Sequence, residues 1–222
     1  MIFKTVGPPV PLTEMTAVTK PTGRLYEVKE GKWYPSVTTV TGHRKKDSII
    51  KWRKRVGEEE ANKISSRATS RGNKFHSMVE CYLNNESVKF DEDSPLASFM
   101  FKTAKDTLNR IDNIHLLESP LYSDKLRIAG RVDCIAEFDG ELAVIDFKTS
   151  TKPKKEKWIE NYFVQETAYA VMYYVLCGIE VNKIVTLIAV EDGTVQVFEK
   201  SNLDTYYHLL IEYIDEFMAM LK

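Results

Sequence analysis

Two aspartates lie on either side of a short turn in the stretch AGRVDCIAEFDGELAVIDFKTSTK, residues 129–152. Asp133 and Asp146 each interrupt an apolar run, and the two runs are joined by Asp139-Gly140. Asp-Gly between apolar runs is a strong signal for a type I′ hairpin, whose two central residues both need positive φ. If these are the turn residues, Asp133 lies directly opposite Asp146, with Cβ atoms roughly 5 Å apart.

Two ionised carboxylates that face each other destabilise a strand pair unless positive charge lies between them. The residues around both acids are apolar on both faces, so we expect buried strands and a divalent cation held by oxygen ligands. Side chains alternate along a strand, so Lys148 shares the face of Asp146. In the alternative interpretation, one aspartate lies outside the sheet and the other pairs with Arg131 or Lys148. A bulge would also shift the register.

The hydrophobic pattern predicts the elements that position these groups. Residues 1–35 are expected to form an extended arm with one hairpin around Glu30-Gly31. Helices are predicted over residues 48–83, broken near Arg71-Gly72, and over residues 98–113, 159–177 and 202–221. Strands are predicted over residues 116–123, 127–138, 141–148, 183–190 and 194–199. This order indicates one α/β domain with a helical N-terminal elaboration.

Composition excludes several classes of protein. With 222 residues, 43% of them hydrophobic, the chain can bury a core, and its net charge of −1 favours no class of partner. The three cysteines, at positions 81, 134 and 177, form no CxxC pair, which argues against a disulfide framework, a zinc ribbon and a cysteine-ligated iron–sulfur cluster. The N-terminus resembles neither a signal peptide nor a transit peptide, and no apolar run approaches 18 residues. We therefore expect a soluble, cytoplasmic protein with no membrane contact.

Four short motifs, in this order along the chain, resemble those of the PD-(D/E)XK nucleases: RGNKFHSMVE, GRVD, IDFKTS and QETAY. The pattern is most similar to the RecB-type branch, and within it to the mitochondrial genome maintenance exonucleases and their phage and bacterial relatives, over about residues 34–174. Val132 stands where the superfamily name has a proline, as is usual in that branch. The resemblance implies an α/β fold with a mixed central β-sheet flanked by helices, the restriction-endonuclease-like core. It also implies a metal-dependent exonuclease that acts on single-stranded DNA from a free end.

The resemblance predicts one nuclease domain over residues 1–222. Residues 1–115 would supply the arm and the helices with the histidine motif, residues 116–200 the catalytic sheet and helix, and residues 201–222 a C-terminal helix. The cysteine cluster of iron–sulfur members is missing, so that cofactor is expected to be absent. No GxxxxGK[ST] phosphate loop is present, so we expect neither a helicase engine nor a nucleotide cofactor.

The resemblance also assigns roles within the site. One or two Mg²⁺ or Mn²⁺ ions would be held by His76, Asp133, Asp146 and the backbone carbonyl of Phe147. Lys148 would orient or help deprotonate the attacking water and offset the developing negative charge. Glu80, one helical turn from His76, would order a water at the metal or remain a solvated helix residue. Gln165 and Tyr169 resemble the Q-x-x-x-Y motif that supports the site and touches the DNA backbone, with ordinary packing as the alternative.

Basic side chains near these motifs predict where DNA would lie. Residues 43–55 carry seven Lys or Arg against one acid, and residues 67–74 and 152–158 add further positive charge. Basic groups hold phosphates, and aromatic rings stack on unpaired bases. The candidate DNA-binding residues are Ser36, Thr38, Arg44, Lys45, Lys51, Trp52, Arg53, Arg71, Thr149 and Ser150. The alternatives are a solvated lysine-rich helix face for the basic residues and turn capping for the hydroxyls.

The predicted function is therefore metal-dependent hydrolysis of single-stranded DNA from a free end, in DNA replication, repair or recombination. The setting would be a bacterial cell or a phage-infected host, with replication or recombination proteins as candidate partners. Two competing functions remain open. One is a structure-specific or flap endonuclease that uses the same site, and the other is a non-catalytic DNA-binding protein with a nuclease fold.

Overall fold

The main sheet is mixed and has five strands. A computed structural model describes residues 1–90 and 94–221. In that part of the chain the strand order is β4 (Ile111–Ser123), β5 (Ile128–Phe138), β6 (Glu141–Ser150), β7 (Lys183–Val190) and β8 (Val195–Ser201). β6 and β7 run parallel, whereas the other neighbouring pairs are antiparallel. Every residue of β7 is buried, as expected for a central strand that is covered on both faces.

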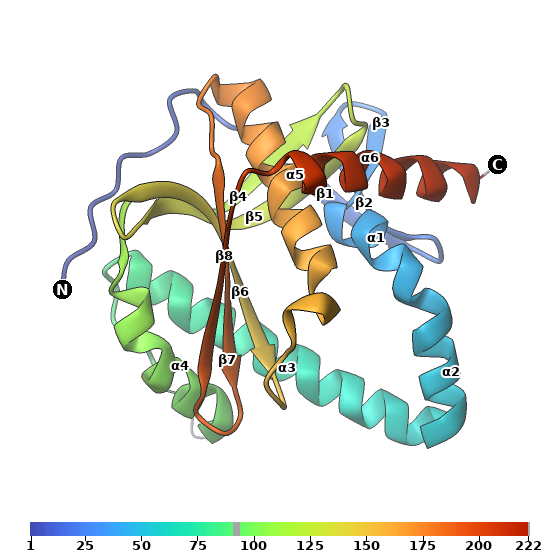
Figure 1. Cartoon of the computed structure of the whole chain (residues 1–222), viewed down its shortest axis with the longest axis horizontal. Coiled ribbons are helices and arrows are strands. Elements are labelled where there is room, and N and C mark those ends of the chain that lie inside the picture. Colours follow the sequence, from blue (N-terminus) through green and yellow to red (C-terminus); the bar gives the residue numbers. More distant parts are fainter. Residues whose placement is uncertain (91–93, 222) are drawn as a thin grey trace.

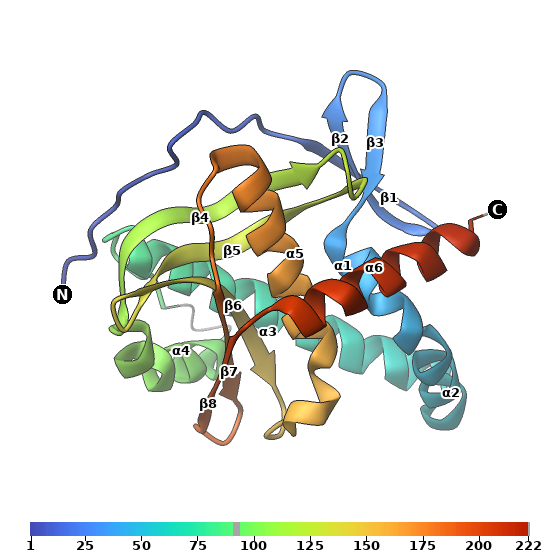
Figure 2. The ribbon, with the colours of Figure 1, turned by 45° about the horizontal axis from the view of Figure 1, so that its top comes forward.

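Helices cover both faces of this sheet, which confirms the predicted fold class. α5 (Glu160–Cys177) connects β6 to β7 and packs with α1 (Val37–Gly42) and α6 (Asp204–Ala219) against one face. α3 (Glu58–Leu83) and α4 (Pro95–Leu108) pack against the other. Figure 1 views β7 and β8 nearly edge-on, with α4 on one side and α5 on the other, and Figure 2 shows the same layers after a turn of 45°.

The predicted β5–β6 hairpin has the predicted turn. Asp139 and Gly140 both have positive φ, +54° and +80°, as a type I′ turn requires. Phe138 pairs with Glu141, and this register continues up to the pair of Cys134 and Ile145. The turn therefore fixes which residues of the two strands face each other.

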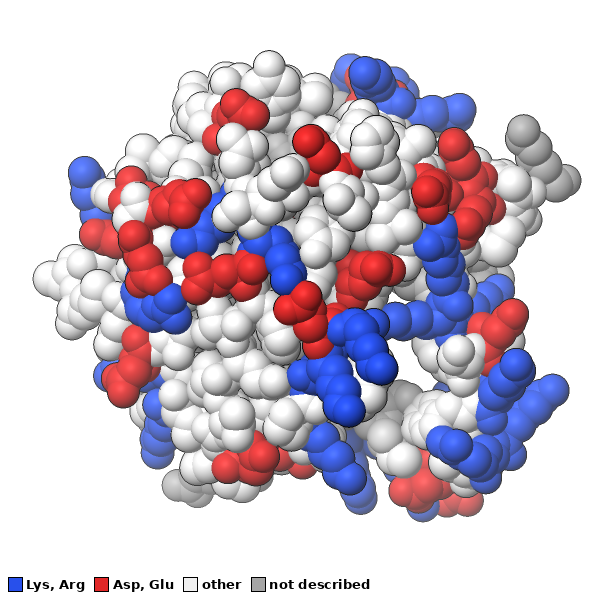
Figure 3. Space-filling model, in the orientation of Figure 1, with Lys and Arg blue, Asp and Glu red and all other residues white. Residues whose placement is uncertain are grey.

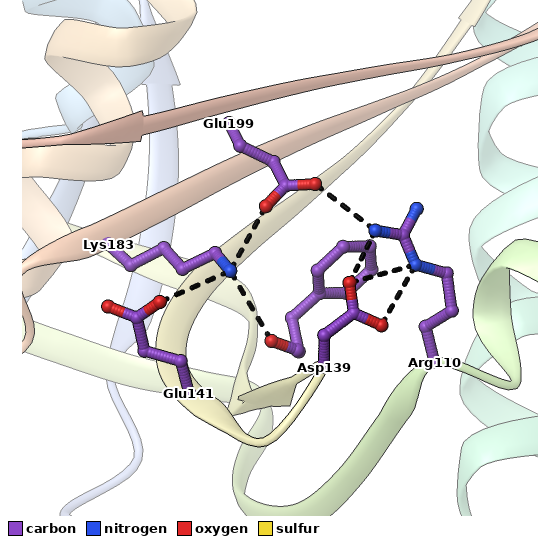
Figure 4. A network of polar contacts seen from close by, with 6 residues as sticks. Arg110, Asp139, Glu141, Lys183 and Glu199 are labelled. Carbon is purple, nitrogen blue, oxygen red and sulfur yellow. Dashed lines mark hydrogen bonds and ion pairs between the residues drawn. The ribbon is translucent and has the colours of Figure 1, made fainter.

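Charged side chains fix the turn end of the sheet (Figure 4). Arg110 donates from Nε to Asp139 over 3.0 Å and also pairs with Glu199 of β8. Lys183, at the start of β7, pairs with Glu199 at 3.0 Å and with Glu141 at 3.3 Å. These contacts connect the β5–β6 turn to β7 and β8. They therefore stabilise the strand register at this end of the sheet.

A small second sheet precedes the helices. It consists of β1 (Thr16–Lys20), β2 (Gly23–Lys29) and β3 (Lys32–Pro35), all antiparallel. The β2–β3 turn lies at Glu30-Gly31 as predicted, and β1 adds a strand that the sequence did not predict. The segment before β1 is extended, and its Phe3 is buried in the core cluster that includes residues of α3 and α4.

Two predicted helix boundaries were wrong. The helical break lies at Gly57, between α2 (Lys46–Val56) and α3, and not near Arg71-Gly72. Gly57 has φ of +88°, which no α-helix allows, whereas a glycine inside a long helix costs only about 1 kcal/mol relative to alanine. α4 ends at Leu108, so residues 109–113 form a turn and the start of β4, and Asn113 has positive φ.

α2 and the outer part of α3 stand away from the core. A short 3₁₀ turn, η1 (His43–Lys45), leads into α2, and α2 contains no buried residue. Figure 3 shows an opening between this helical pair and the rest of the molecule, with Lys and Arg side chains on its sides. Within residues 1–90 and 94–221, no helix combines the length and apolarity needed to span a membrane.

Candidate active site

An open pocket of about 1120 Å³ lies beside α3 and the neighbouring strands β4, β5 and β6. Residues of β1 and β2 and Tyr169 of α5 also line it. The pocket brings together predicted site residues that are far apart in the sequence. They are Ser36, Thr38, His76, Glu80, Asp133, Lys148 and Tyr169.

Asp146 is the most buried acid of the predicted set. It lies on β6 and is 2% exposed. Its Oδ1 accepts a hydrogen bond of 2.8 Å from Nε2 of Gln165 on α5. Its Oδ2 forms an ion pair with Nζ of Lys148, two residues further along the strand. The predicted Asp, Lys and Gln therefore meet at one point, where α5 crosses β6.

Asp133 lies on β5, and its carboxylate turns toward the backbone of β6. The paired ladder ends at Cys134 and Ile145, one position short of the two acids, so the direct facing pair that the sequence predicts is not a paired position of the sheet. Instead Oδ2 of Asp133 accepts a hydrogen bond of 2.9 Å from the N–H of Phe147. Asp146 is paired with Thr186 of the parallel strand β7. Both acids are still inside the sheet, as predicted.

His76 of α3 faces Asp133 together with a third acid, Glu118 of β4. Nδ1 of His76 lies 3.6 Å from Oε1 of Glu118 and 3.7 Å from Oδ2 of Asp133. One ligand atom from each of the three residues lies within 4.8 Å of the others. An imidazole nitrogen and carboxylate oxygens at this spacing are a donor set that suits a divalent cation such as Mg²⁺ or Mn²⁺.

Burial and crowding of charge shift the pKa values in this region. Burial, together with the charge of Asp133, raises the pKa of Asp146 to about 6 against the lowering effect of Lys148. Burial lowers the pKa of Lys148, but the nearby Asp146 and Asp133 outweigh it, so this pKa is raised and Lys148 stays charged. Burial also opposes protonation of His76, yet its close contact with the Glu118 carboxylate and the charge of Asp133 raise its pKa. The acids therefore stabilise the protonated forms of Lys148 and His76.

Tyr169 packs against the glycine of the GRVD motif. A Cβ atom built on Gly130 would lie 2.6 Å from the Tyr169 hydroxyl and 2.9 Å from its ring. Tyr169 is 3% exposed and lines the pocket. The glycine is therefore required for space rather than for backbone conformation, because it lets α5 approach β5.

The predicted hydroxyl contacts are engaged within the protein. Ser36 caps α1, since its Oγ accepts the N–H of Thr39 at 3.0 Å, and it contacts Thr38 Oγ1 at the same distance. Thr149 accepts a hydrogen bond from Arg71 Nε at 3.3 Å, and Ser150 donates to the carbonyl of Lys152. The capping alternative therefore describes Ser36, although it also lines the pocket.

The predicted basic residues separate into two groups. Arg44 pairs with Glu216 of α6 at 2.6 Å and lies over the Tyr213 ring, and Arg71 pairs with Glu191. Lys45 and Arg53 also form hydrogen bonds within the protein, to Asn161 and to Asn62 respectively. These contacts favour structural roles for the first group. The second group, Lys51 and Trp52, lies on α2, where Lys51 is exposed and Trp52 half-buried.

Sequence reasoning missed two acids near the site. Glu118 was not chosen because its place depends on the β4–β5 register, and the turn between those strands carries no Asp-Gly signal. Glu166 of α5 is fully buried, and its Oε1 accepts a hydrogen bond from Thr186. Burial raises the pKa of Glu166 well above its ordinary value, because the charged carboxylate is poorly solvated there. Its position next to Gln165 was visible in QETAY, but the helical pattern does not distinguish a buried acid from a solvated one.

Comparison with known proteins confirms the resemblance to nucleases. Residues 86–176 match the model of the PD-(D/E)XK nuclease superfamily. That segment contains Asp133, Asp146, Lys148 and Gln165, whereas His76 lies before it.

Individual proteins similar in sequence to this chain include mitochondrial genome maintenance exonucleases. The human mitochondrial genome maintenance exonuclease 1 is 31% identical over 129 residues, covering 54% of this chain and 38% of the human protein. The Mus musculus protein is 32% identical over 111 residues, covering 48% of this chain and 32% of its own length. The Xenopus tropicalis protein is 29% identical over 155 residues, covering 66% and 44%. The match thus spans less than half of each relative.

Proposed function

We propose that this relative of the PD-(D/E)XK nucleases is a metal-dependent deoxyribonuclease that hydrolyses single-stranded DNA from a free end. The observation that carries the proposal is the buried meeting of Asp146, Lys148 and Gln165 beside Asp133 and His76. A buried ion pair such as Asp146 with Lys148 adds little to the stability of a sheet, because the cost of removing both charges from water can exceed their mutual attraction. A site for a doubly charged metal and a phosphate accounts for the arrangement.

The residues present fit a divalent cation. Ligand atoms of His76 and Asp133 lie within 4.8 Å of each other. Asp146 and the Phe147 carbonyl would complete the set that the resemblance implies, and one or two Mg²⁺ or Mn²⁺ ions are proposed. When bound, such a cation lowers the pKa of a coordinated water and polarises a phosphoryl oxygen. The protein's own side chains then orient the phosphate and the attacking water and supply the fixed charge of the site.

Lys148 supplies the fixed positive charge of the site. Its ammonium group is held by Asp146 and lies 5.2 Å from the centroid of the Tyr162 ring. Asp146 is in turn oriented by Gln165. A preorganised charge of this kind stabilises the negative charge that develops on the phosphate in the transition state. We propose that Lys148 also orients the attacking water and helps to remove its proton.

The surface around α2 supports a single-stranded nucleic acid as substrate. The opening beside α2 has Lys and Arg side chains on its sides (Figure 3). Two tryptophans add aromatic surface, since Trp158 is 51% exposed and Trp52 lies among the basic residues of α2. Basic groups bind phosphates without regard to sequence, and indole rings stack only on bases that are not already stacked in a duplex.

We propose that residues 1–222 act as one nuclease domain. Residues of β1 and β2 line the same pocket as α3 and the main sheet, so the N-terminal part contributes directly to the site. Roles in DNA replication, repair or recombination, and partners from those processes, are proposed from the similarity to the genome maintenance exonucleases.

The proposal is tested with linear and circular single strands of the same sequence, incubated with purified protein and Mg²⁺ or Mn²⁺. The expected result is degradation of the linear strand alone, none of it in EDTA, and none by Asp146→Asn. Cleaved circles would instead indicate an endonuclease. Binding of DNA with no cleavage in either metal would contradict an enzymatic function and favour the DNA-binding alternative.

A further inference from the structure

We propose that Glu118 of β4 is a third metal-ligating carboxylate of this site, in addition to Asp133 and Asp146. The inference rests on the proposed function, because it assigns a further residue to the same metal centre. It goes beyond the motifs, since Glu118 lies in none of them. The inference follows from the register of β4 and β5 and from the position of the Glu118 side chain.

The register places Glu118 in line with the two motif acids. Leu117 pairs with Cys134 and Ser119 pairs with Val132, so Glu118 occupies the position opposite Asp133. On β5 and β6, Asp133 and Asp146 occupy the position directly after the last paired residues, Cys134 and Ile145. Three neighbouring strands therefore each contribute one carboxylate at the same level of the sheet.

The side chain of Glu118 points at the other ligand atoms. Its Oε1 lies 3.6 Å from Nδ1 of His76, which is itself 3.7 Å from Oδ2 of Asp133. All three side chains line the pocket and are largely shielded, with 25%, 28% and 13% of their surface exposed for Glu118, His76 and Asp133 respectively. No lysine or arginine side chain forms an ion pair with Glu118 among the described residues.

The backbone at Glu118 is unusual and helps to explain this direction. Its φ is +44°, a left-handed conformation that a glutamate rarely adopts. Arg131 of β5 donates to the carbonyl of Glu118 and holds that conformation from the neighbouring strand. A residue kept in such a region is commonly found near functional sites.

Charge favours the same role. His76 is neutral when it binds a metal, and Lys148 offsets one of the carboxylates, so Asp133 and Asp146 together with Lys148 leave a single net negative charge. Glu118 supplies a second one, which matches a divalent cation, and hard cations prefer carboxylate oxygens. Loss of Glu118 should therefore weaken cation binding rather than fold stability.

The competing role for Glu118 is to orient the His76 ring through a hydrogen bond. Glu118→Gln separates the two roles, because the amide oxygen still accepts a hydrogen bond from the imidazole but carries no charge. Glu118→Asp keeps the charge on a shorter side chain. Glu137→Gln is the matched control, since Glu137 lies on β5, is half-buried and bonds to Asn113 outside the pocket.

The experiment measures Mn²⁺ binding by the full chain, by calorimetry and by the EPR signal of free Mn²⁺, without DNA. Circular dichroism establishes which variants are folded. We expect Glu118→Gln to weaken Mn²⁺ binding about 10-fold or more, Glu118→Asp to lie between it and the wild type, and Glu137→Gln to match the wild type.

Two results would overturn the inference. Wild-type affinity in every folded Glu118 variant would exclude Glu118 as a ligand while leaving the proposed metal-dependent nuclease intact. Absence of Mn²⁺ binding by the wild type itself would overturn both the inference and the metal dependence on which it rests.

Discussion

Gln165 on α5 donates a hydrogen bond from Nε2 to Oδ1 of Asp146 on β6 over 2.8 Å, and both side chains are buried. The bond joins the crossover helix to the strand that carries Asp146 and Lys148. The amide of Gln165 occupies only Oδ1 of Asp146 and so fixes the orientation of the carboxylate. Oδ2 remains available to contact Lys148 or a cation. In the proposed metal site, Gln165 would orient the carboxylate of Asp146 toward the cation.

Replacement of Gln165 by alanine should lower cleavage about 10- to 100-fold. The reason is that Oδ1 of Asp146 loses its only hydrogen-bond donor among the described residues. Initial rates on an end-labelled single strand measure the effect, and Mn²⁺ affinity should fall with them. Gln196→Ala is the control, because Gln196 bonds to the backbone of Lys154 away from the pocket. Equal rates for both variants would show that the Gln165 bond has no role in activity.

Gly130→Ala should displace Tyr169 and destabilise the protein by about 1–3 kcal/mol. A Cβ atom at this position meets the hydroxyl of the buried Tyr169 at 2.6 Å and its ring at 2.9 Å. The free energy of unfolding in urea measures the loss. Combining Gly130→Ala with Tyr169→Phe removes the closest atom, so part of the stability should return. A double mutant no more stable than Gly130→Ala would mean that the clash is not the cause.

Glu166→Gln should flatten the pH dependence of stability. A carboxyl whose pKa is raised on folding holds its proton more tightly in the folded state, so stability falls as pH rises from the unfolded value of 4.5 toward the raised folded value. Glutamine removes this contribution and can still bond to Thr186. Thermal unfolding of both proteins from pH 5 to 8 measures it. Curves that remain parallel would show that the folded-state pKa of Glu166 is not raised.

Arg44 and Lys51 should respond differently to alanine, although both were predicted to bind DNA. Arg44 joins η1 to α6 through Glu216 and lies 4.0 Å from the centre of the Tyr213 ring, so its loss should lower the unfolding temperature. Loss of Lys51 should leave that temperature unchanged, weaken DNA binding, and reduce by about one the slope of log affinity against log salt. A DNA-binding defect in Arg44→Ala alone would reverse this assignment.

The arrangement of the candidate site was predictable from the sequence only where a local signal fixed its geometry. The Asp-Gly turn gave the β5–β6 register, and the alternation of strand residues placed Lys148 beside Asp146. Glu118 was not predictable in this way, because a longer connection joins β4 to β5 and their register depends on the rest of the sheet.

The same limit applies to helices and basic residues. A glycine ends a helix when its backbone adopts positive φ, so the sequence alone did not distinguish Gly57 from Gly72. Similarly, the charge cluster of residues 43–55 did not reveal that Arg44 is held by acids of α6, which lie more than 160 residues away. Local patterns predicted the elements, and tertiary contacts decided which charges remain available.

The most direct test of the central claim is a crystal grown with Mn²⁺, with anomalous scattering measured at the manganese absorption edge. The proposed function predicts an anomalous peak in the pocket, within bonding distance of oxygens of Asp133 and Asp146 and a nitrogen of His76. The further inference adds an oxygen of Glu118. A pocket without any such peak, at a Mn²⁺ concentration that supports cleavage in solution, would contradict the claim that these residues form the metal site.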